Sequence, residues 1–495
     1  MNMSTRIVVI GAGFGGLAAA IRLAARGERV TLVEKLDQPG GRAAVFRQDG
    51  FVFDAGPTVI TAPWLITELF ELAGRRPDDY LTLLPVDPFY RIFFDDGASF
   101  DYSGSPERMQ DEILRLTGDP AEVRGYERFL AQSRRIFDKG FTELAAKPFL
   151  SVRDMAAIAP ALVRLNAYRN VYRFVSGYVR NEQLRQVLSF HPLLVGGNPF
   201  SAPSIYALIH YLEREWGVWY ASGGTGAVVR ALTDLFTELG GNLRLNAEVS
   251  RICTSGNRVT GVELAGGEEI TADIVVSNAD VAMTYERLLP GSPRFRSPSR
   301  LRHSMSLVVI YFGTDRQYRS QSRSALAHHS VILGPRYREL LGDIFERKVL
   351  ADDFSLYLHM PTLTDPTLAP EGGEAFYVLA PVPNLEGAID WEDAAGPYRD
   401  RIMRFLEERY LPDLSRHLVT ERIVDPRYFR DTLSSHAGAA FSVEPTLTQS
   451  AYFRPHNRAR SFPNLYFVGA GTHPGAGLPG VLTSAKIADD LIRHA

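Results

Sequence analysis

The feature that most constrains the fold is a glycine cluster that directly follows an apolar, β-branched segment near the start of the chain. Residues 6–10 (RIVVI) have the composition of a buried parallel strand, and residues 11–16 read GAGFGG. Residues 17–27 (LAAAIRLAARG) predict a helix that ends at glycine. Residues 29–33 predict a second strand, which ends at Glu34. The order strand, glycine loop, helix, strand predicts a βαβ unit.

In a dinucleotide site, each glycine at this spacing has a physical role. One glycine permits a tight turn, one lets backbone N–H groups approach a pyrophosphate, and one lets the helix pack closely on the strand. The helix N-terminus then faces the phosphate charge. An acid at the end of the second strand can accept hydrogen bonds from a ribose diol and disfavours the 2′-phosphate of NADP. The pattern therefore predicts a dinucleotide site, with a purely structural turn as the alternative. Its predicted residues are Gly11, Gly13, Gly15, Gly16 and Glu34.

Length and composition indicate a folded protein of two or more domains. The chain has 495 residues, of which 45% are hydrophobic and 22% charged. The net charge of −3 gives no reason to expect a nucleic-acid partner. A single cysteine, Cys253, excludes disulfide bonds and cysteine metal clusters, and we predict no metal site. No apolar stretch reaches the roughly 18–20 residues of a spanning helix, and the first residues contain no signal-peptide pattern. We therefore expect a chain that does not cross a membrane.

Two further segments identify the dinucleotide. Residues 39–42 read PGGR and residues 50–57 read GFVFDAGP. The arginine can donate two hydrogen bonds to the same pyrophosphate, although a glycine hairpin with a surface arginine is the alternative. The order Glu34, GGR, DxGP resembles the flavoprotein family that includes amine oxidases, protoporphyrinogen oxidase and carotenoid desaturases. This resemblance implies FAD as the cofactor. It implies cofactor roles for Gly41, Arg42, Asp54 and Gly56.

The C-terminal segment narrows the resemblance. Residues 462–492 read FPNLYFVGAGTHPGAGLPGVLTSAKIADDLI, which predicts a strand over 465–468, a glycine- and proline-rich loop, and a helix from about Gly480. This run resembles the signature of bacterial-type phytoene desaturases throughout, and HPG at 473–475 separates it from amine oxidases. In such flavoproteins this unit closes the FAD site. The residues implied here are Gly469, Gly471 and Gly480.

The resemblance also implies how the chain is divided. The expected fold is an α/β, two-dinucleotide-binding-fold flavoprotein with a Rossmann-like FAD domain, a mixed-sheet substrate domain and a helical, membrane-associating lobe. The FAD domain is expected to combine residues 1–65, 223–280 and 462–495. The substrate domain is expected to combine 66–222 and 281–461, with the lobe at about 140–222. Within the second FAD segment the resemblance pairs the backbone of Val249 with adenine and sets Asn278 and Asp280 near the cofactor.

A bacterial-type phytoene desaturase removes two hydrogens from adjacent carbons of a C40 hydrocarbon, in carotenoid biosynthesis. Flavin N5 takes one as hydride, and the other leaves as a proton. Such a substrate has no polar group, so its site must be a long apolar channel. For a base we favour Asp154, beside Arg153, with His359 and His473 as alternatives.

Residues 164–180 (RLNAYRNVYRFVSGYVR) predict a helix that could lie on a membrane. Apolar and aromatic residues recur at three- and four-residue steps, and the segment holds arginines but no acid. An ordinary core-packed helix is the alternative. The apolar stripe comprises Leu165, Tyr168, Tyr172, Val175 and Val179, and the basic side Arg169, Arg173 and Arg180. We expect peripheral association with the cytoplasmic face of a membrane.

The resemblance thus implies a phytoene desaturase that converts 15-cis-phytoene to all-trans-lycopene, and the likeness to lycopene-forming members implies four steps. A three-step, neurosporene-forming enzyme or another carotenoid desaturase is the near alternative. An amine or porphyrinogen oxidase, and a flavoprotein that binds carotenoid without reaction, are more remote. Oxygen and a quinone are both open as the electron acceptor.

Overall fold

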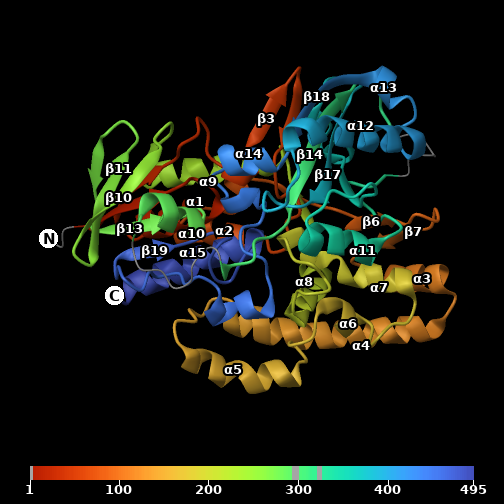
Figure 1. The fold of residues 1–495 in the computed structure, drawn as a ribbon, viewed down its shortest axis with the longest axis horizontal. Coiled ribbons are helices and arrows are strands. Elements are labelled where there is room, and N and C mark those ends of the chain that lie inside the picture. Colours follow the sequence, from red (N-terminus) through yellow and green to blue (C-terminus); the bar gives the residue numbers. More distant parts are fainter. Residues whose placement is uncertain (1–3, 292–299, 320–325) are drawn as a thin grey trace.

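The computed structural model describes residues 4–291, 300–319 and 326–495. A parallel sheet of five strands, in the order β19-β13-β1-β2-β9, lies at the end of the molecule that holds both termini (Figure 1). Its strands are β1 (Arg6–Ile10), β2 (Arg29–Val33), β9 (Asn242–Arg244), β13 (Ile274–Ser277) and β19 (Leu465–Phe467). The sheet therefore draws strands from each of the three segments that the sequence analysis assigned to the cofactor domain.

The apolar run of β1 is explained by burial on both faces of this sheet. Ile7 and Val9 pack toward helices on one face, whereas Val8 and Ile10 pack toward a second sheet on the other. The helices are α1 (Phe14–Ala25), α2 (Trp64–Leu72), α9 (Thr225–Glu238) and α15 (Leu478–Arg493). The second sheet is antiparallel and contains β10 (Val249–Ser255), β11 (Arg258–Leu264) and β12 (Glu269–Thr271). The predicted βαβ unit is confirmed as β1, α1 and β2, with β1 and β2 parallel.

A mixed sheet of seven strands forms the other half of the molecule. Its order is β18-β14-β17-β16-β15-β6-β7, and only the β15–β6 pair is parallel. The strands are β6 (Tyr90–Phe93), β7 (Ser99–Tyr102), β14 (Ser306–Thr314), β15 (His329–Ile332), β16 (Leu356–His359), β17 (Glu374–Val382) and β18 (Leu418–Val424). One face packs on α12 (Trp391–Arg409), and the other contributes to the large core shared with the helical lobe.

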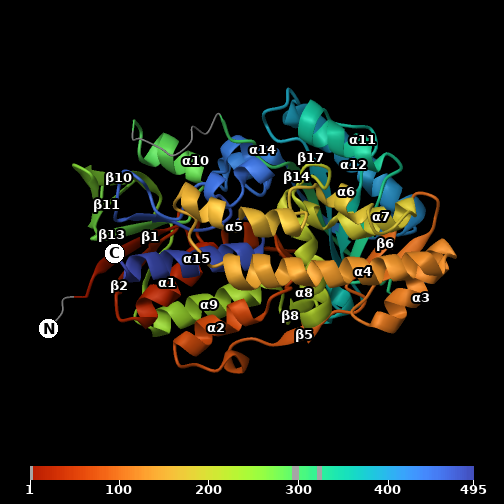
Figure 2. The same ribbon diagram turned by 90° about the horizontal axis from the view of Figure 1, so that it is seen from below.

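The helical lobe begins earlier than the predicted boundary near residue 140. Figure 2 shows the long α4 running beside the other helices of the lobe. These helices are α3 (Pro106–Thr117), α4 (Pro120–Phe137), α5 (Val152–Arg164), α6 (Val171–Val175), α7 (Glu182–Ser189) and α8 (Leu208–Trp216). Ser105 and Asp119 cap α3 and α4, and each is followed by proline, which suits the first turn of a helix.

The prediction of one amphipathic helix over 164–180 is wrong. Helix α5 ends at Arg164, and only the short α6 follows within this range. Tyr172, Val175 and Val179 are buried in the core of the lobe. These three residues of the apolar stripe pack inward, where neighbouring helices cover them, whereas Tyr168 of the same stripe is 53% exposed.

The remaining elements are short. They are β3 (Val45–Gln48), β4 (Phe51–Asp54), β5 (Leu83–Pro85), β8 (Trp219–Ala221), α10 (Val281–Met283), α11 (Tyr337–Gly342), α13 (Leu414–His417) and α14 (Pro426–Asp431). Of the helices in the described ranges, none combines the length and hydropathy needed to span a bilayer.

Candidate functional site

A cavity of about 790 Å³ runs from the glycine loop after β1 to the seven-stranded sheet. At the first end it is lined by the loop 11–15, by Glu34 and by the start of α15. At the other end it is lined by β14, β16 and β17 and by helices of the lobe. The two halves of the fold therefore share one site.

The carboxyl ends of β1, β13 and β19 meet at the first end. Asn278, which follows β13, donates from Nδ2 to the carbonyl of Gly11 at 3.2 Å. A Cβ on Gly15 would lie 2.6 Å from Asn278 Oδ1 and 3.0 Å from the backbone nitrogen of Gly469. No side chain caps α1, whose N-terminus faces this space. The arrangement is a cradle of backbone N–H groups that suits a pyrophosphate.

Glu34 lies at the end of β2 and is buried. Its Oε2 accepts a hydrogen bond from the N–H of Ala12 at 2.7 Å, and its Oε1 accepts one from Leu36 at 3.0 Å. These bonds hold the carboxylate at the cavity wall. The position is that of the acid which binds the ribose in dinucleotide folds.

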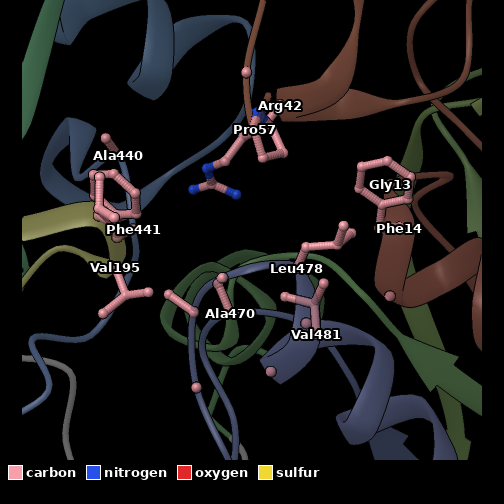
Figure 3. Close-up of a pocket in the computed structure, with 18 of the residues that line it drawn as sticks. Gly13, Phe14, Arg42, Pro57, Val195, Ala440, Phe441, Ala470, Leu478 and Val481 are labelled. Atoms are coloured by element: carbon pink, nitrogen blue, oxygen red, sulfur yellow. The ribbon is translucent and has the colours of Figure 1, made fainter. Parts of the chain in front are cut away.

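Arg42, which is half-buried, brings a positive charge to the cavity. Figure 3 shows its side chain extending between Pro57 and the C-terminal loop. One terminal nitrogen donates to Ser435 Oγ and to the carbonyl of Ala439, while Nε has no partner. A guanidinium at the cavity whose buried Nε lacks a partner fits an anionic group such as a pyrophosphate.

The C-terminal segment forms the opposite wall. Helix α15 begins at Leu478, two residues before the predicted start, and Leu478 and Val481 face the cavity in Figure 3. A Cβ on Gly480 would lie 2.5 Å from the carbonyl of Gly475, so the helix start packs tightly on its loop. Ser484 accepts a hydrogen bond from the N–H of Gly469 at 2.8 Å and fixes the loop after β19.

Most of the predicted cofactor residues line this cavity. They are Gly11, Gly13, Gly15, Glu34, Gly41, Arg42, Gly56, Val249, Asn278, Gly469 and Gly480, together with Asp280. Three others lie behind the wall. Asp54 accepts hydrogen bonds from the start of α9, a Cβ on Gly16 would lie 1.9 Å from the carbonyl of Gly11, and Gly471 packs against Ser442 and Val281. These three support the site without reaching into it.

The other end of the cavity is apolar and aromatic. Among the described residues that line it, Glu213 is the only acid outside the dinucleotide end. The apolar wall includes Phe149, Met155, Ile158, Phe190, Leu193, Val195, Leu212, Met305, Leu307, Val309, Leu333, Leu379 and Phe441. Such a surface binds a hydrocarbon by contact area and excludes ions.

Polar side chains in this apolar end were missed by the sequence analysis. Glu213 accepts a hydrogen bond from Tyr90 OH at 2.7 Å and is 3.1 Å from His191 Nε2. Burial raises the pKa of Glu213 to about 7. Tyr357 and Tyr377 also line the cavity. Two features of the sequence mark this region: the motif EREWGVW at 213–219, which begins with Glu213, and the histidine pair at 328–329. Neither of them indicates which side chains these residues contact.

The predicted base candidates are spread over three places. Asp154 does not line the cavity; its carboxylate accepts the N–H of Ser151 at 2.8 Å in the capping box of α5. His359 is buried beside two other histidines, behind the wall. His473 lines the cavity, and burial lowers its pKa to about 3. The location of Asp154 gives its catalytic role no support.

Fold and site together define a dinucleotide-binding flavoprotein with an apolar second compartment. Residues 14–492 match the family model described as flavin containing amine oxidoreductase. A lycopene-forming phytoene desaturase of Pseudescherichia vulneris is 54% identical over 98% of this chain and 99% of its own. A neurosporene-forming phytoene desaturase of Rhodobacter capsulatus is 42% identical over 99% of this chain and 94% of its own. Putrescine oxidase, solved with putrescine, covers 100% of both chains with a TM-score of 0.66 at 14% identity, a likeness of fold.

The chain therefore belongs to the flavin-containing amine oxidoreductase family and, within it, to the phytoene desaturases.

Proposed function

We propose that this protein is an FAD-dependent phytoene desaturase that forms lycopene. The observation that carries the proposal is one continuous cavity, with a dinucleotide cradle at one end and an apolar wall at the other. The 54% identity to a relative named lycopene-forming, against 42% to one named neurosporene-forming, supports the four-step product.

The residues at the cradle would hold FAD. Glu34 would bind the adenosine ribose, the N-terminus of α1 and Arg42 the pyrophosphate, and the start of α15 the flavin. When bound, FAD supplies the acceptor for a hydride from carbon. The apolar wall orients the chain of the substrate and excludes water from the reacting carbons.

The experiment is anaerobic reduction of the FAD-loaded protein by 15-cis-phytoene in liposomes, followed by extraction of the polyene. We expect flavin bleaching and a product that absorbs as lycopene. A shorter chromophore would contradict the four-step product and keep the class of enzyme. Bleaching by an amine but not by phytoene would contradict the desaturase itself.

We further propose that the protein binds the cytoplasmic face of a membrane through α5. Val152 and Val163 on the outer face of this helix are each 63% exposed, and Arg153 and Arg164 lie beside them. On its inner face, Met155, Ile158 and Leu162 line the cavity. An exposed apolar and basic helix above the cavity supports entry of a lipid-dissolved substrate there.

Flotation with anionic vesicles tests the membrane proposal. The double substitution V152E/V163E is expected to move the protein from the vesicle fraction to the soluble fraction. The matched control is V349E/V419E, which charges two exposed valines on the substrate half and is expected to float as the wild type does. Equal flotation of both variants would contradict a role for α5.

We also propose oxygen or a quinone as the acceptor that reoxidises the cofactor. Stopped-flow mixing of the reduced protein with oxygen, and separately with a soluble quinone, identifies which of the two restores flavin absorbance on the time scale of turnover.

A further inference from the structure

A chain of hydroxyl and imidazole groups leads away from the cavity through the seven-stranded sheet. It begins at Tyr357, which lines the cavity where the dinucleotide end meets the apolar end, beside Thr58. The hydroxyl of Tyr357 lies 3.1 Å from Thr58 Oγ1 and 2.7 Å from His329 Nδ1. Burial raises the pKa of Tyr357, so this hydroxyl keeps its proton and can donate it to the imidazole.

The register of two strands brings three histidines together behind this tyrosine. His329 on β15 pairs with His359 on β16, and His328 precedes β15. A ring nitrogen from each lies within 4.8 Å of the others. His359 Nε2 is 3.1 Å from His328 Nε2, and His328 Nδ1 is 2.6 Å from Thr364 Oγ1. Thr364 is half-buried, so the chain ends where solvent begins.

The series of hydrogen bonds is interrupted once, between His329 and His359. Each of these two rings has one nitrogen without a partner. His329 Nε2 and His359 Nδ1 are buried and have no hydrogen-bond partner. Their rings are stacked, with centroids 5.3 Å apart. Buried imidazole nitrogens are normally paired, so the two orphans are the natural positions for a bridging water or a small ring rotation.

The three imidazoles are suited to pass a proton and not to hold one. Burial lowers the pKa of His328 to about 3, and burial with repulsion between the rings holds the pKa of His329 and of His359 well below the ordinary value of 6.5. A neutral imidazole accepts a proton at one nitrogen and releases one from the other. The cluster can therefore transmit a proton without remaining charged in the apolar interior.

We propose that the Tyr357–Thr364 chain carries to the protein surface the proton that the substrate loses in each desaturation. This inference rests on the proposed function. The electrons of the broken C–H bond form the new double bond as the neighbouring carbon gives up its hydride. The released proton goes to the Tyr357 oxygen, the hydroxyl proton of Tyr357 goes to His329 Nδ1, and the imidazoles pass one proton on to Thr364. One proton enters the chain and one leaves it.

The test follows proton release in an anaerobic single turnover of the FAD-loaded protein, in weak buffer with a pH indicator, while flavin absorbance is recorded. In the wild type we expect proton release to keep pace with flavin bleaching. Y357F is expected to slow release by roughly 100-fold, the low end of a general acid–base effect. T364V, at the outer end, is expected to delay release while bleaching proceeds.

Y398F is the matched control, because Tyr398 on α12 is buried on the other face of the seven-stranded sheet and does not line the cavity. It is expected to keep proton release in step with bleaching. FAD content and melting temperature, measured for every variant, exclude unfolding as the cause of a slow release. Release at the wild-type rate in Y357F, or release that stays in step with bleaching in T364V, would overturn the proposal.

A second measurement does not depend on turnover. In ¹⁵N-histidine NMR of the protein without substrate, we expect three neutral rings, with Nδ1 of His329 accepting a hydrogen bond that Y357F removes. A metal ion bound in stoichiometric amount at the three rings would overturn the proposal, because it would occupy the nitrogens that must pass the proton. If phytoene does not bleach the flavin of the wild-type protein, the proposed function is contradicted. The NMR signals do not depend on that function, because they report only on the series of groups from Tyr357 to Thr364.

Discussion

The carboxylate of Asp54 accepts a hydrogen bond from the backbone N–H of Thr225 at 2.9 Å, across 171 residues of sequence. Its other oxygen accepts the N–H of Gly226 at 3.1 Å. Asp54 ends β4, next to the loop that lines the cavity, and Thr225 begins α9. This contact joins residues 1–65 to residues 223–280. It also gives hydrogen-bond acceptors to backbone N–H groups in the first turn of α9, which have no partner within that helix.

Removal of this carboxylate is expected to weaken both folding and cofactor binding. D54A leaves two buried N–H groups unpaired, which costs about 1–3 kcal/mol of unfolding free energy. We expect a lower denaturation midpoint in urea and weaker FAD binding by fluorescence titration. D54N, which keeps one acceptor oxygen, is expected to lie between D54A and the wild type. Unchanged midpoints in both variants would show that the contact contributes nothing.

The glycine loop has no room for a methyl group at Gly16. In G16A the new Cβ would lie 1.9 Å from the carbonyl of Gly11, so β1 and α1 must separate and FAD retention should be lost. Gly266, in the exposed turn between β11 and β12, is the matched control, because nothing lies within 4 Å of its added Cβ and its φ lies outside the left-handed region. G266A is expected to retain FAD and to raise stability by about 0.4–1 kcal/mol, because alanine restricts the unfolded chain. Absorbance of bound flavin and thermal melting measure the two effects, and FAD retention in G16A would contradict the first.

Asp154 is expected to matter for the helix it begins and not for the reaction. D154A removes half of the capping box with Ser151 and should destabilise α5, by about 0.5–2 kcal/mol. D154N keeps an oxygen that can accept the Ser151 N–H, and we expect wild-type rates of flavin bleaching by phytoene. A large loss of bleaching rate in D154N, with unchanged stability, would instead restore Asp154 as the base.

The buried Glu213 is expected to make stability fall as pH rises. Burial raises its pKa to about 7, above an ordinary value of 4.5, so the folded state holds this proton more tightly than the unfolded state does. The stabilising contribution is complete below about pH 4.5 and is lost as pH rises through 7. Relative to E213Q, the wild type should lose about 1–3 kcal/mol of unfolding free energy between pH 5 and 8.

Urea denaturation of both proteins across this range measures the difference. The neighbouring His191 stays uncharged throughout the range in the folded state, since burial lowers its pKa to about 3. Its unfolded-state titration is common to both proteins and cancels in the comparison. A constant difference between wild type and E213Q from pH 5 to 8 would mean that Glu213 titrates near its ordinary pKa.

Local sequence signals were sufficient to predict secondary structure wherever the residues of a short segment determine its conformation themselves. The run from Arg6 to Glu34 specifies strand, turn, helix and strand by composition, glycine spacing and periodicity, and the structure follows it closely. The same holds for the unit from Leu465 to α15. The failure over 164–180 has an equally local origin. Periodicity records which residues are apolar, but it does not say whether protein or membrane covers them, and here the lobe buries Val175 and Val179.

By itself, then, the sequence determined the βαβ unit, the C-terminal strand, loop and helix, the glycine positions that admit a dinucleotide and the family to which the chain belongs. Only the tertiary structure decided which distant groups meet. Asp54 reaches Thr225, and His329 faces His359, because sheet register and loop packing fix them. Buried polar groups such as Glu213 acquire their shifted pKa from that packing as well. Desolvation and hydrogen bonding depend on what surrounds a side chain in space, which no short stretch of sequence contains.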